Sequence, residues 1–190
     1  MLFNSLPFLI FAIVFFAFWP FLNKKKNARY SGIVLFSFLF YGWWDWRFLF
    51  LILFSGIIDY VAGLLICSNQ KRKKLYLAIS LIANVGSLAV FKYAVLLAES
   101  LDSILALASI DLGLQNNLPE FTLILPVGIS FYTFQSMSYT IDIYRNQLKP
   151  TKNIFHFFAF LAMFPQLVAG PIIRAKNLLK QLEEYKETTS

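Results

Sequence analysis

Long apolar runs separated by short clusters of basic residues dominate this sequence. A helix needs about 20 apolar residues to cross a bilayer core about 30 Å thick. Apolar runs of this length or somewhat shorter fill residues 1–22, 30–44, 48–67, 75–98 and 126–143. Lys and Arg gather between them, at 24–29, 71–74 and 145–152, as in the cytoplasmic loops of membrane proteins. We predict an all-α, polytopic transmembrane helix bundle of about five spans, forming a single membrane domain over residues 1–190.

Composition supports a lipid environment. Hydrophobic residues make up 58% of the chain and charged residues 14%, against about 25% charged in a soluble domain. The net charge of +7 lies in the loops, so we expect the lipid bilayer, and no nucleic acid, as a partner. The single cysteine, Cys67, excludes an intrachain disulfide and a multi-cysteine metal site, and no metal-binding cluster is expected.

The positive-inside rule predicts the orientation of the spans. With the three basic loops in the cytoplasm, the protein lies in the inner (cytoplasmic) membrane with its N-terminus outside. Trp43, Trp44 and Trp46 then form an outer aromatic belt. Residues 99–120 carry only acidic charges, and apolar residues recur there at helical spacing up to Gly113. This segment predicts an amphipathic helix on the outer surface.

The apolar segment 153–173 breaks this alternation of sides. If it crossed the membrane fully, Arg174, Lys176 and Lys180 would lie outside. We therefore predict a re-entrant segment, broken at Pro165 or at Gly170–Pro171, followed by a polar tail over 174–190. Irregular backbone at membrane depth needs surrounding protein or a water-filled cavity, so the break indicates a cavity.

Three ionisable groups have both a functional and a structural interpretation. Asp59 lies in the middle of an apolar run, where a carboxylate is a functional candidate; a link to a polar side chain on a neighbouring helix is the favoured alternative. Lys92 is expected to reach the interface. His156, the single histidine, has the chemistry of a general base, but an interfacial position without catalytic chemistry is favoured.

A polar stripe runs through the segment 126–146. Spacings of three or four residues place most of its members on one helix face. A polar face needs protein or a wet channel beside it, so tunnel lining and a plain interface between helices both stay open. Asp142 and Arg145 are also spaced for a local ion pair. The candidate tunnel-lining residues are Gly128, Tyr132, Gln135, Ser138, Tyr139, Asp142 and Asn146.

Two motifs carry a resemblance to a known family. The first is Leu-Pro-Val-Gly-Ile-Ser-Phe-Tyr-Thr-Phe-Gln at 125–135, continuing to Arg145, and the second is Phe-Pro-Gln-Leu-Val-Ala-Gly-Pro-Ile-Ile-Arg at 164–174. Both resemble the membrane-bound O-acyltransferase family, in the branch of alginate O-acetyltransferases and D-alanyl transfer proteins. The family-motif residues of the second stretch are Phe164, Pro165, Gln166, Gly170 and Pro171.

The resemblance implies transfer of an acyl group from a cytoplasmic donor to a hydroxyl of an extracellular polymer. The donor would be acetyl-CoA or another activated acyl carrier, used as a substrate, with no bound cofactor. The candidates for attracting its phosphate groups are Arg145, Lys149, Lys152 and Arg174. The family's catalytic histidine lies in a later helix that matches nothing here, so no catalytic residue is assigned, and the 190-residue chain alone is expected to be an inactive N-terminal portion.

Within the branch, O-acetylation of an exopolysaccharide such as alginate is the favoured activity. Extracellular transferase partner proteins would complete the transfer to the polysaccharide acceptor. The alternatives are D-alanyl transfer to teichoic acid and a non-enzymatic polytopic membrane protein, either transporter-like or an assembly subunit.

Overall fold

The computed structural model describes residues 4–107, 113, 118, 128–170 and 173–184. All regular elements within these ranges are helical, as predicted. The long helices are α1 (Leu6–Leu22), α2 (Lys26–Asp45), α3 (Leu49–Ser68), α4 (Lys73–Leu107) and α6 (Ile129–Tyr144). The short helices α7 (Ile154–Leu161), α8 (Phe164–Ala169) and α9 (Ala175–Glu184) follow, and the 3-10 turns Trp46–Phe48 and Gln70–Arg72 precede α3 and α4.

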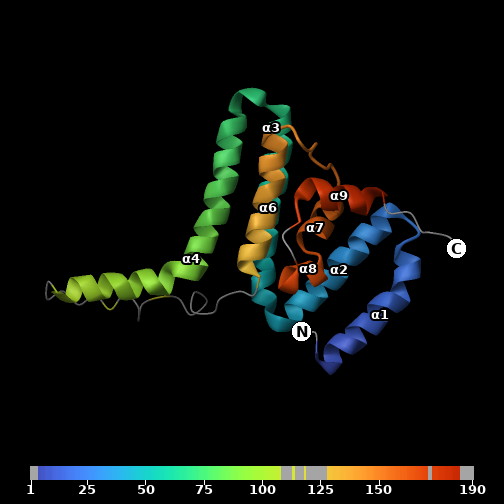
Figure 1. The fold of residues 1–190 in the computed structure, drawn as a ribbon, viewed down its shortest axis with the longest axis horizontal. Coiled ribbons are helices and arrows are strands. Elements are labelled where there is room, and N and C mark those ends of the chain that lie inside the picture. The colour runs from blue at the N-terminus through green and yellow to red at the C-terminus, as the bar shows by residue number, and fades with distance from the viewer. Residues whose placement is uncertain (1–3, 108–112, 114–117, 119–127, 171–172, 185–190) are drawn as a thin grey trace.

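Helix α3 is at the centre of the bundle. It packs against α6 and α4, and α6 also contacts α4 (Figure 1). Helix α2 packs against α7 and α8, and α1 lies along the outer side of α2 (Figure 1). Helix α9 contacts both α6 and α7, so it joins the two parts of the bundle.

The faces of α3 show that the bundle is apolar outside and polar inside. Phe50, Phe54 and Ile57 are 61%, 53% and 48% exposed on the outer face. Ser55 and Asp59 are buried on the inner face. A soluble helix has the opposite arrangement, whereas a helix in lipid exposes apolar side chains and buries polar ones. The sequence prediction of a membrane protein agrees with this arrangement.

Two segments are long and apolar enough to cross a membrane, namely Trp46–Ser68 and Gln70–Leu107. The segments Leu6–Leu22 and Ile154–Gln166 are apolar but shorter. Length and composition thus identify two candidate spans in the described part of the chain, and the expected total of about five stays a prediction.

Helix α4 is longer than the sequence predicted. We expected a span to end near residue 98 and a separate amphipathic helix to occupy 99–120. Instead residues 99–107 continue α4 without a break, and the second half of α4 turns away from the bundle (Figure 1). Of the remainder of 99–120, the structure describes only Gly113, whose φ is 55°, and Leu118, so the helix stop expected at Gly113 stays a prediction.

The apolar segment 153–173 is broken, as predicted, but its first interruption precedes the expected Pro165. Its first helix, α7, has eight residues and is about 12 Å long, which is too short to cross the bilayer. The break falls at Ala162 and Met163, just before Phe164 and Pro165 begin α8. Helix α8 ends at Gly170. The chain therefore bends twice within this segment.

Much of the expected polar tail is a packed helix. Residues 175–184 form α9, whose Ala175, Leu178, Leu179 and Leu182 are buried. The four side chains lie on one helix face because they are spaced by one, three or four residues. Apolar packing of this face therefore holds a segment whose average composition is polar.

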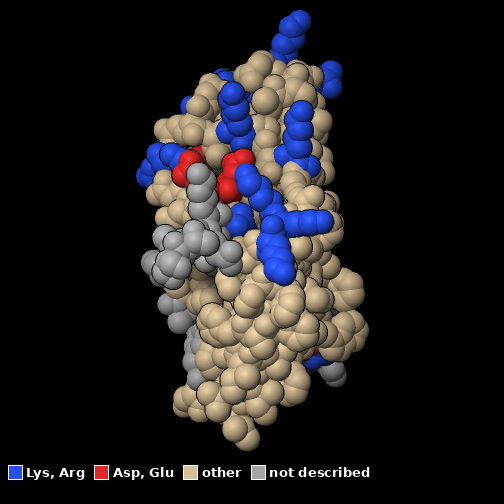
Figure 2. Space-filling view, turned by 90° about the vertical axis from the view of Figure 1, so that its right-hand side faces the viewer, with Lys and Arg blue, Asp and Glu red and all other residues tan. Residues whose placement is uncertain are grey.

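The basic segments meet at one end of the molecule. Figure 2 shows Lys and Arg gathered over the upper half of one face, above an almost uncharged lower half. Asn153 donates to Asn27 at 2.9 Å, and Arg29 donates to the carbonyl oxygen of Leu182 at 2.7 Å. Lys73 lies 4.8 Å from the ring centroid of Tyr144. The loops predicted to share one side of the membrane are thus close in space, together with α9.

Candidate functional site

Asp59 is the centre of a polar cluster that joins three helices. Its side chain is 0% exposed. Ser80 of α4 and Ser136 of α6 donate to it, and Asn84 of α4 donates to both carboxylate oxygens, at 3.0 and 2.9 Å. Ser55 of α3 in turn donates to Asn84. Every partner donates, an arrangement that satisfies a carboxylate. The structure favours the interpretation of Asp59 as a link between helices.

The predicted tunnel-lining residues are mostly buried within the bundle. Tyr132, Gln135, Tyr139 and Asp142 have exposed fractions of 1%, 3%, 0% and 5%. Ser138 is half-buried and donates to the carbonyl oxygen of Gln135 in its own helix. The pockets described below are lined by other residues. The tunnel therefore stays a prediction.

Two members of the stripe act on the backbone of α6. Gly128 precedes the first turn with a φ of 77°, a left-handed conformation that glycine adopts without strain. Asn146 ends the helix with a φ of 57°, and the next residue, Gln147, donates its N–H to the carbonyl oxygen of Asp142 at 2.8 Å. This is a common helix C-terminus. The spacing of Asn146 thus reflects helix termination, and its side chain is exposed.

Three polar atoms of α6 are buried without a hydrogen-bond partner among the described residues. They are Tyr132 Oη, Thr133 Oγ1 and Asp142 Oδ2. The expected pair of Asp142 with Arg145 is not among the ion pairs of the described residues. An unpaired buried polar atom costs about 1–3 kcal/mol, so these atoms are suited to a further polar partner.

Neighbouring helices satisfy the backbone where the chain breaks between α7 and α8. Gln135 of α6 donates its Nε2 to the carbonyl oxygen of Phe160 at 2.6 Å. Ser37 of α2 accepts from the N–H of Phe164 at 3.1 Å. Free helix ends inside a bundle need such partners. One residue of each motif thus takes part at this break: Gln135 of the first motif binds its α7 side, and the N–H of Phe164 of the second motif is bound on its α8 side.

The family-motif residues hold α8 against the first two helices. Phe164 is buried among the rings of Phe11, Phe15 and Phe40, with centroids 5.1–5.5 Å apart. Pro165 lies in the first turn of α8, where its missing N–H costs nothing. Gln166 is buried, and a Cβ added at Gly170 would lie 2.5 Å from the Cα of Gln166. Pro171 lies outside the described residues.

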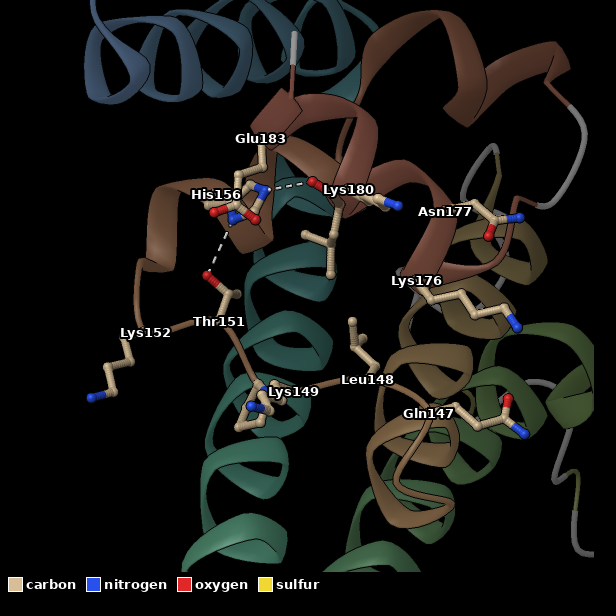
Figure 3. A pocket seen from close by; sticks show the side chains of 12 residues that line it. Gln147, Leu148, Lys149, Thr151, Lys152, His156, Lys176, Asn177, Lys180 and Glu183 are labelled. Atoms are coloured by element: carbon tan, nitrogen blue, oxygen red, sulfur yellow. Dashed lines mark hydrogen bonds between the residues drawn. The ribbon is translucent and has the colours of Figure 1, made fainter.

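A pocket of about 610 Å³ opens at the basic end. Its walls are the loop 147–152 and α9, with the first turn of α7 between them (Figure 3). Four lysines line it, two from the loop and two from α9, together with one acidic residue, Glu183. The lysines are Lys149, Lys152, Lys176 and Lys180. We call this cavity the basic pocket.

His156 forms part of the wall of the basic pocket. Its Nε2 lies 3.1 Å from the carbonyl oxygen of Leu179, which can only accept, so Nε2 carries the proton. Its Nδ1 then accepts from the hydroxyl of Thr151 at 3.2 Å. The ring stacks on Tyr30 with centroids 4.4 Å apart. Burial lowers the pKa of His156 below its ordinary value, which favours the neutral ring. Both nitrogens are engaged, which fits a structural role.

The structure brings together only half of the residues expected to attract phosphate. Lys149 and Lys152 line the basic pocket, whereas Arg145 and Arg174 are exposed and do not. Sequence reasoning missed Lys176 and Lys180 as members of this group. They are four residues apart, on one side of a helix. The sequence shows that spacing, but only the packing of α9 places the two lysines opposite the loop 147–152.

Two apolar grooves occur elsewhere, between α1 and α2 and beside Phe155. Lys92, Trp43 and Trp46 are exposed, and the side chain of Trp44 lies outside the described set. Their expected positions at the membrane interface stay predictions. No group of His, Cys, Asp and Glu in the described residues could hold a metal ion.

Comparison with known proteins supports the resemblance seen in the two motifs. The chain is 37% identical over 99% of its length to a protein of Pseudomonas aeruginosa named "Probable alginate O-acetylase", of which it covers 36%. It is 36% identical to a Pseudomonas putida protein of the same name, over 94% of this chain and 37% of that protein. It is 31% identical to a Helicobacter pylori protein named "Peptidoglycan O-acetyltransferase", over 97% of this chain and 39% of that protein.

The chain thus spans little more than a third of the length of these curated relatives. No protein-family model matches it, and no solved structure matches it. The similarity extends over nearly the whole chain, so the resemblance predicted from the motifs is confirmed.

Proposed function

We propose that this chain, which is similar over nearly its whole length to proteins named as O-acetylases, is of the membrane-bound O-acyltransferase type and forms part of an enzyme that O-acetylates an extracellular polysaccharide. The observation that carries the proposal is the identity of 31–37% over nearly the whole chain to proteins named as acetylases of alginate or peptidoglycan. These names favour acetylation over D-alanyl transfer and over a non-enzymatic role. Alginate and related exopolysaccharides are the proposed acceptors.

The proposed topology places the basic end of the bundle in the cytoplasm. Its support is the clustering of the basic loops and α9 at that end (Figure 2), together with the positive-inside rule. Helix α1 ends at this side, so the N-terminus is proposed to lie outside the inner membrane. The two short helices α7 and α8 are proposed to form a re-entrant segment, because α7 enters from the basic end and α9 returns to it.

The proposed donor is acetyl-CoA or another activated acyl carrier that reaches the basic end from the cytoplasm. Arg145, Lys149, Lys152 and Arg174 supply positive charge at that end, and long-range attraction of phosphate does not require them to share one pocket. The acyl group would then move along α6. The unpaired atoms Tyr132 Oη and Asp142 Oδ2 support the proposal that this helix borders a polar path.

His156 is not proposed as the base of this reaction. Both of its ring nitrogens have partners within the chain, and a general base needs a nitrogen within reach of the substrate proton. The residues of the chain described here are proposed to guide the acyl group, and extracellular partner proteins to pass it to the polymer.

A chimera tests the proposed function. The segment of the Pseudomonas aeruginosa relative that aligns with this chain would be replaced by residues 1–190, and the chimera expressed in a strain that lacks the relative. We expect acetyl esters to return to the secreted alginate. A matched chimera that carries the aligned segment of the Pseudomonas putida relative is the positive control.

The possible outcomes separate the alternatives. A chimera that inserts into the membrane at normal levels but leaves alginate unacetylated, while the control restores acetylation, contradicts the proposal. D-alanine esters in place of acetyl esters would support the alternative activity. The isolated chain is expected to show no transfer above background.

A further inference from the structure

We propose that the basic pocket is a binding site for a phosphate-bearing ligand, held by Lys149 and Lys152 from the loop and by Lys176 and Lys180 from α9. Its volume of about 610 Å³ lies within the range of about 300–1,000 Å³ of small-molecule sites. Figure 3 shows Lys149 near the centre of this view, Lys152 and Lys176 extending to opposite sides, and His156 beside Glu183 above Thr151.

The charges of the pocket are not balanced by the residues that the structure describes. Among the described residues, Lys149, Lys152 and Lys176 form no ion pair. Lys180 lies 3.7 Å from Glu184, and both side chains are largely exposed, so this contact is weak. Glu183 is the one acidic residue of the lining. Four cations against one anion give a strongly positive cavity, which selects a ligand with more than one negative charge.

The backbone that carries the lysines is held in place. The N–H groups of Gln147 and Leu148 donate to the carbonyl oxygen of Asp142, and Tyr139 Oη accepts from the N–H of Thr151 at 3.3 Å. Tyr60 donates to the carbonyl oxygen of Lys152 at 2.7 Å. A loop anchored by helices α3 and α6 loses little freedom when a ligand binds, which strengthens binding.

Helix α9, the other wall, is anchored as firmly. His156 donates to the carbonyl oxygen of Leu179, and the buried Arg29 donates to that of Leu182. His156 in the pocket wall and Arg29 outside the lining thus fix the helix from which Lys176 and Lys180 extend. The four ammonium groups are therefore attached to a preformed frame. Lys71 of the turn Gln70–Arg72 and Lys74 of the first turn of α4 do not line the pocket.

Two sources can supply the phosphate group. One is the headgroup of an anionic phospholipid at the inner surface of the membrane, and the other is a free phosphate ester or diphosphate from the cytoplasm. The proposal concerns the shared chemistry and does not depend on acyl transfer, so either proposal can fail without the other.

The test compares two double variants of the full chain in nanodiscs. The K149Q/K176Q variant removes one lysine from each wall, and K71Q/K74Q is the control with the same charge change at the same end. Pyrophosphate binding would be measured by calorimetry in phosphatidylcholine nanodiscs at low salt. Retention of phosphatidylglycerol would be measured by native mass spectrometry of protein from phosphatidylglycerol nanodiscs. Far-UV circular dichroism confirms that both variants are folded.

Each lost ammonium–phosphate contact is expected to weaken binding about tenfold, so K149Q/K176Q should bind about 100-fold more weakly while K71Q/K74Q stays within threefold. Selective loss of pyrophosphate identifies a soluble ligand, and selective loss of phosphatidylglycerol identifies a lipid headgroup; both support the site. If neither probe binds the unaltered chain, or if both variants lose binding equally, the proposal is wrong. The lysines would then serve only to orient the spans in the membrane, as the positive-inside rule describes.

Discussion

Replacement of Asp59 by alanine would leave three donors without their acceptor between α3, α4 and α6. These donors are Ser80 Oγ, Asn84 Nδ2 and Ser136 Oγ. Hydrogen bonds between membrane helices contribute about 0.6 kcal/mol each on average and up to about 1.7. Their loss is therefore expected to reduce the free energy of unfolding by about 2–5 kcal/mol, towards the upper value because the acceptor is a carboxylate.

The measurement is unfolding of the detergent-purified chain by increasing mole fractions of sodium dodecyl sulfate, followed by far-UV circular dichroism. Asp59→Asn keeps the shape and one acceptor oxygen, so it should lose less than Asp59→Ala. Ser103→Ala is the control, because Ser103 is exposed and, among the described residues, donates to the carbonyl oxygen of Glu99 in its own helix. One such bond contributes on the order of 0.5 kcal/mol. If the unfolding free energies of Asp59→Ala and Ser103→Ala differ by less than about this amount, the cluster does not hold the helices together.

Three further predictions concern the break, the close helix contacts and His156. Gln135→Leu removes the donor to Phe160 at the break between α7 and α8, so it should lower the free energy of unfolding by about 1–2 kcal/mol and speed hydrogen exchange over 160–166. Unchanged exchange would contradict this role of Gln135. Gly56→Ala should lower the free energy of unfolding by about 1–3 kcal/mol, because the added Cβ would lie 2.5 Å from Phe158. Gly86→Ala is the control, because a Cβ there meets nothing within 4 Å. Equal melting temperatures of the two variants would refute the contact. Burial lowers the pKa of His156, so the unfolded state binds the proton more readily than the folded state. The contribution of His156 to the free energy of unfolding is therefore fully present above about pH 6.5 and falls as the pH drops below that value. His156→Gln should flatten that slope between pH 7 and 5 in thermal melts, and an unchanged slope would assign it to other groups.

The sequence located the helices because each carries a local signal. The run 48–67 predicted a span, and α3 occupies Leu49–Ser68. The proline and glycine residues of 153–173 predicted a break, and the helix is interrupted there. The favoured interpretation of Asp59 as a link to a neighbouring helix also agrees with its contacts, because a carboxylate inside a bundle must find donors.

The errors came from segments in which average composition hid the pattern. Residues 175–184 were expected to belong to a polar tail because Lys, Gln and Glu dominate them. Leu178, Leu179 and Leu182 nevertheless form an apolar face, which the structure buries. The end of α4 was placed too early because acidic residues begin at Glu99, yet charged residues on an exposed helix face do not interrupt its hydrogen bonds.

The sequence by itself determined that this is a membrane protein and which loops carry the positive charge. Both follow from how readily each segment leaves water for lipid. Only the tertiary structure decided which residues meet. The partners of His156 are Thr151, Leu179 and Tyr30, and the basic pocket joins Lys149 to Lys176. These contacts join separate segments and depend on how α9 folds back over α6 and α7. Local propensity does not encode that packing, because apolar burial has no direction of its own.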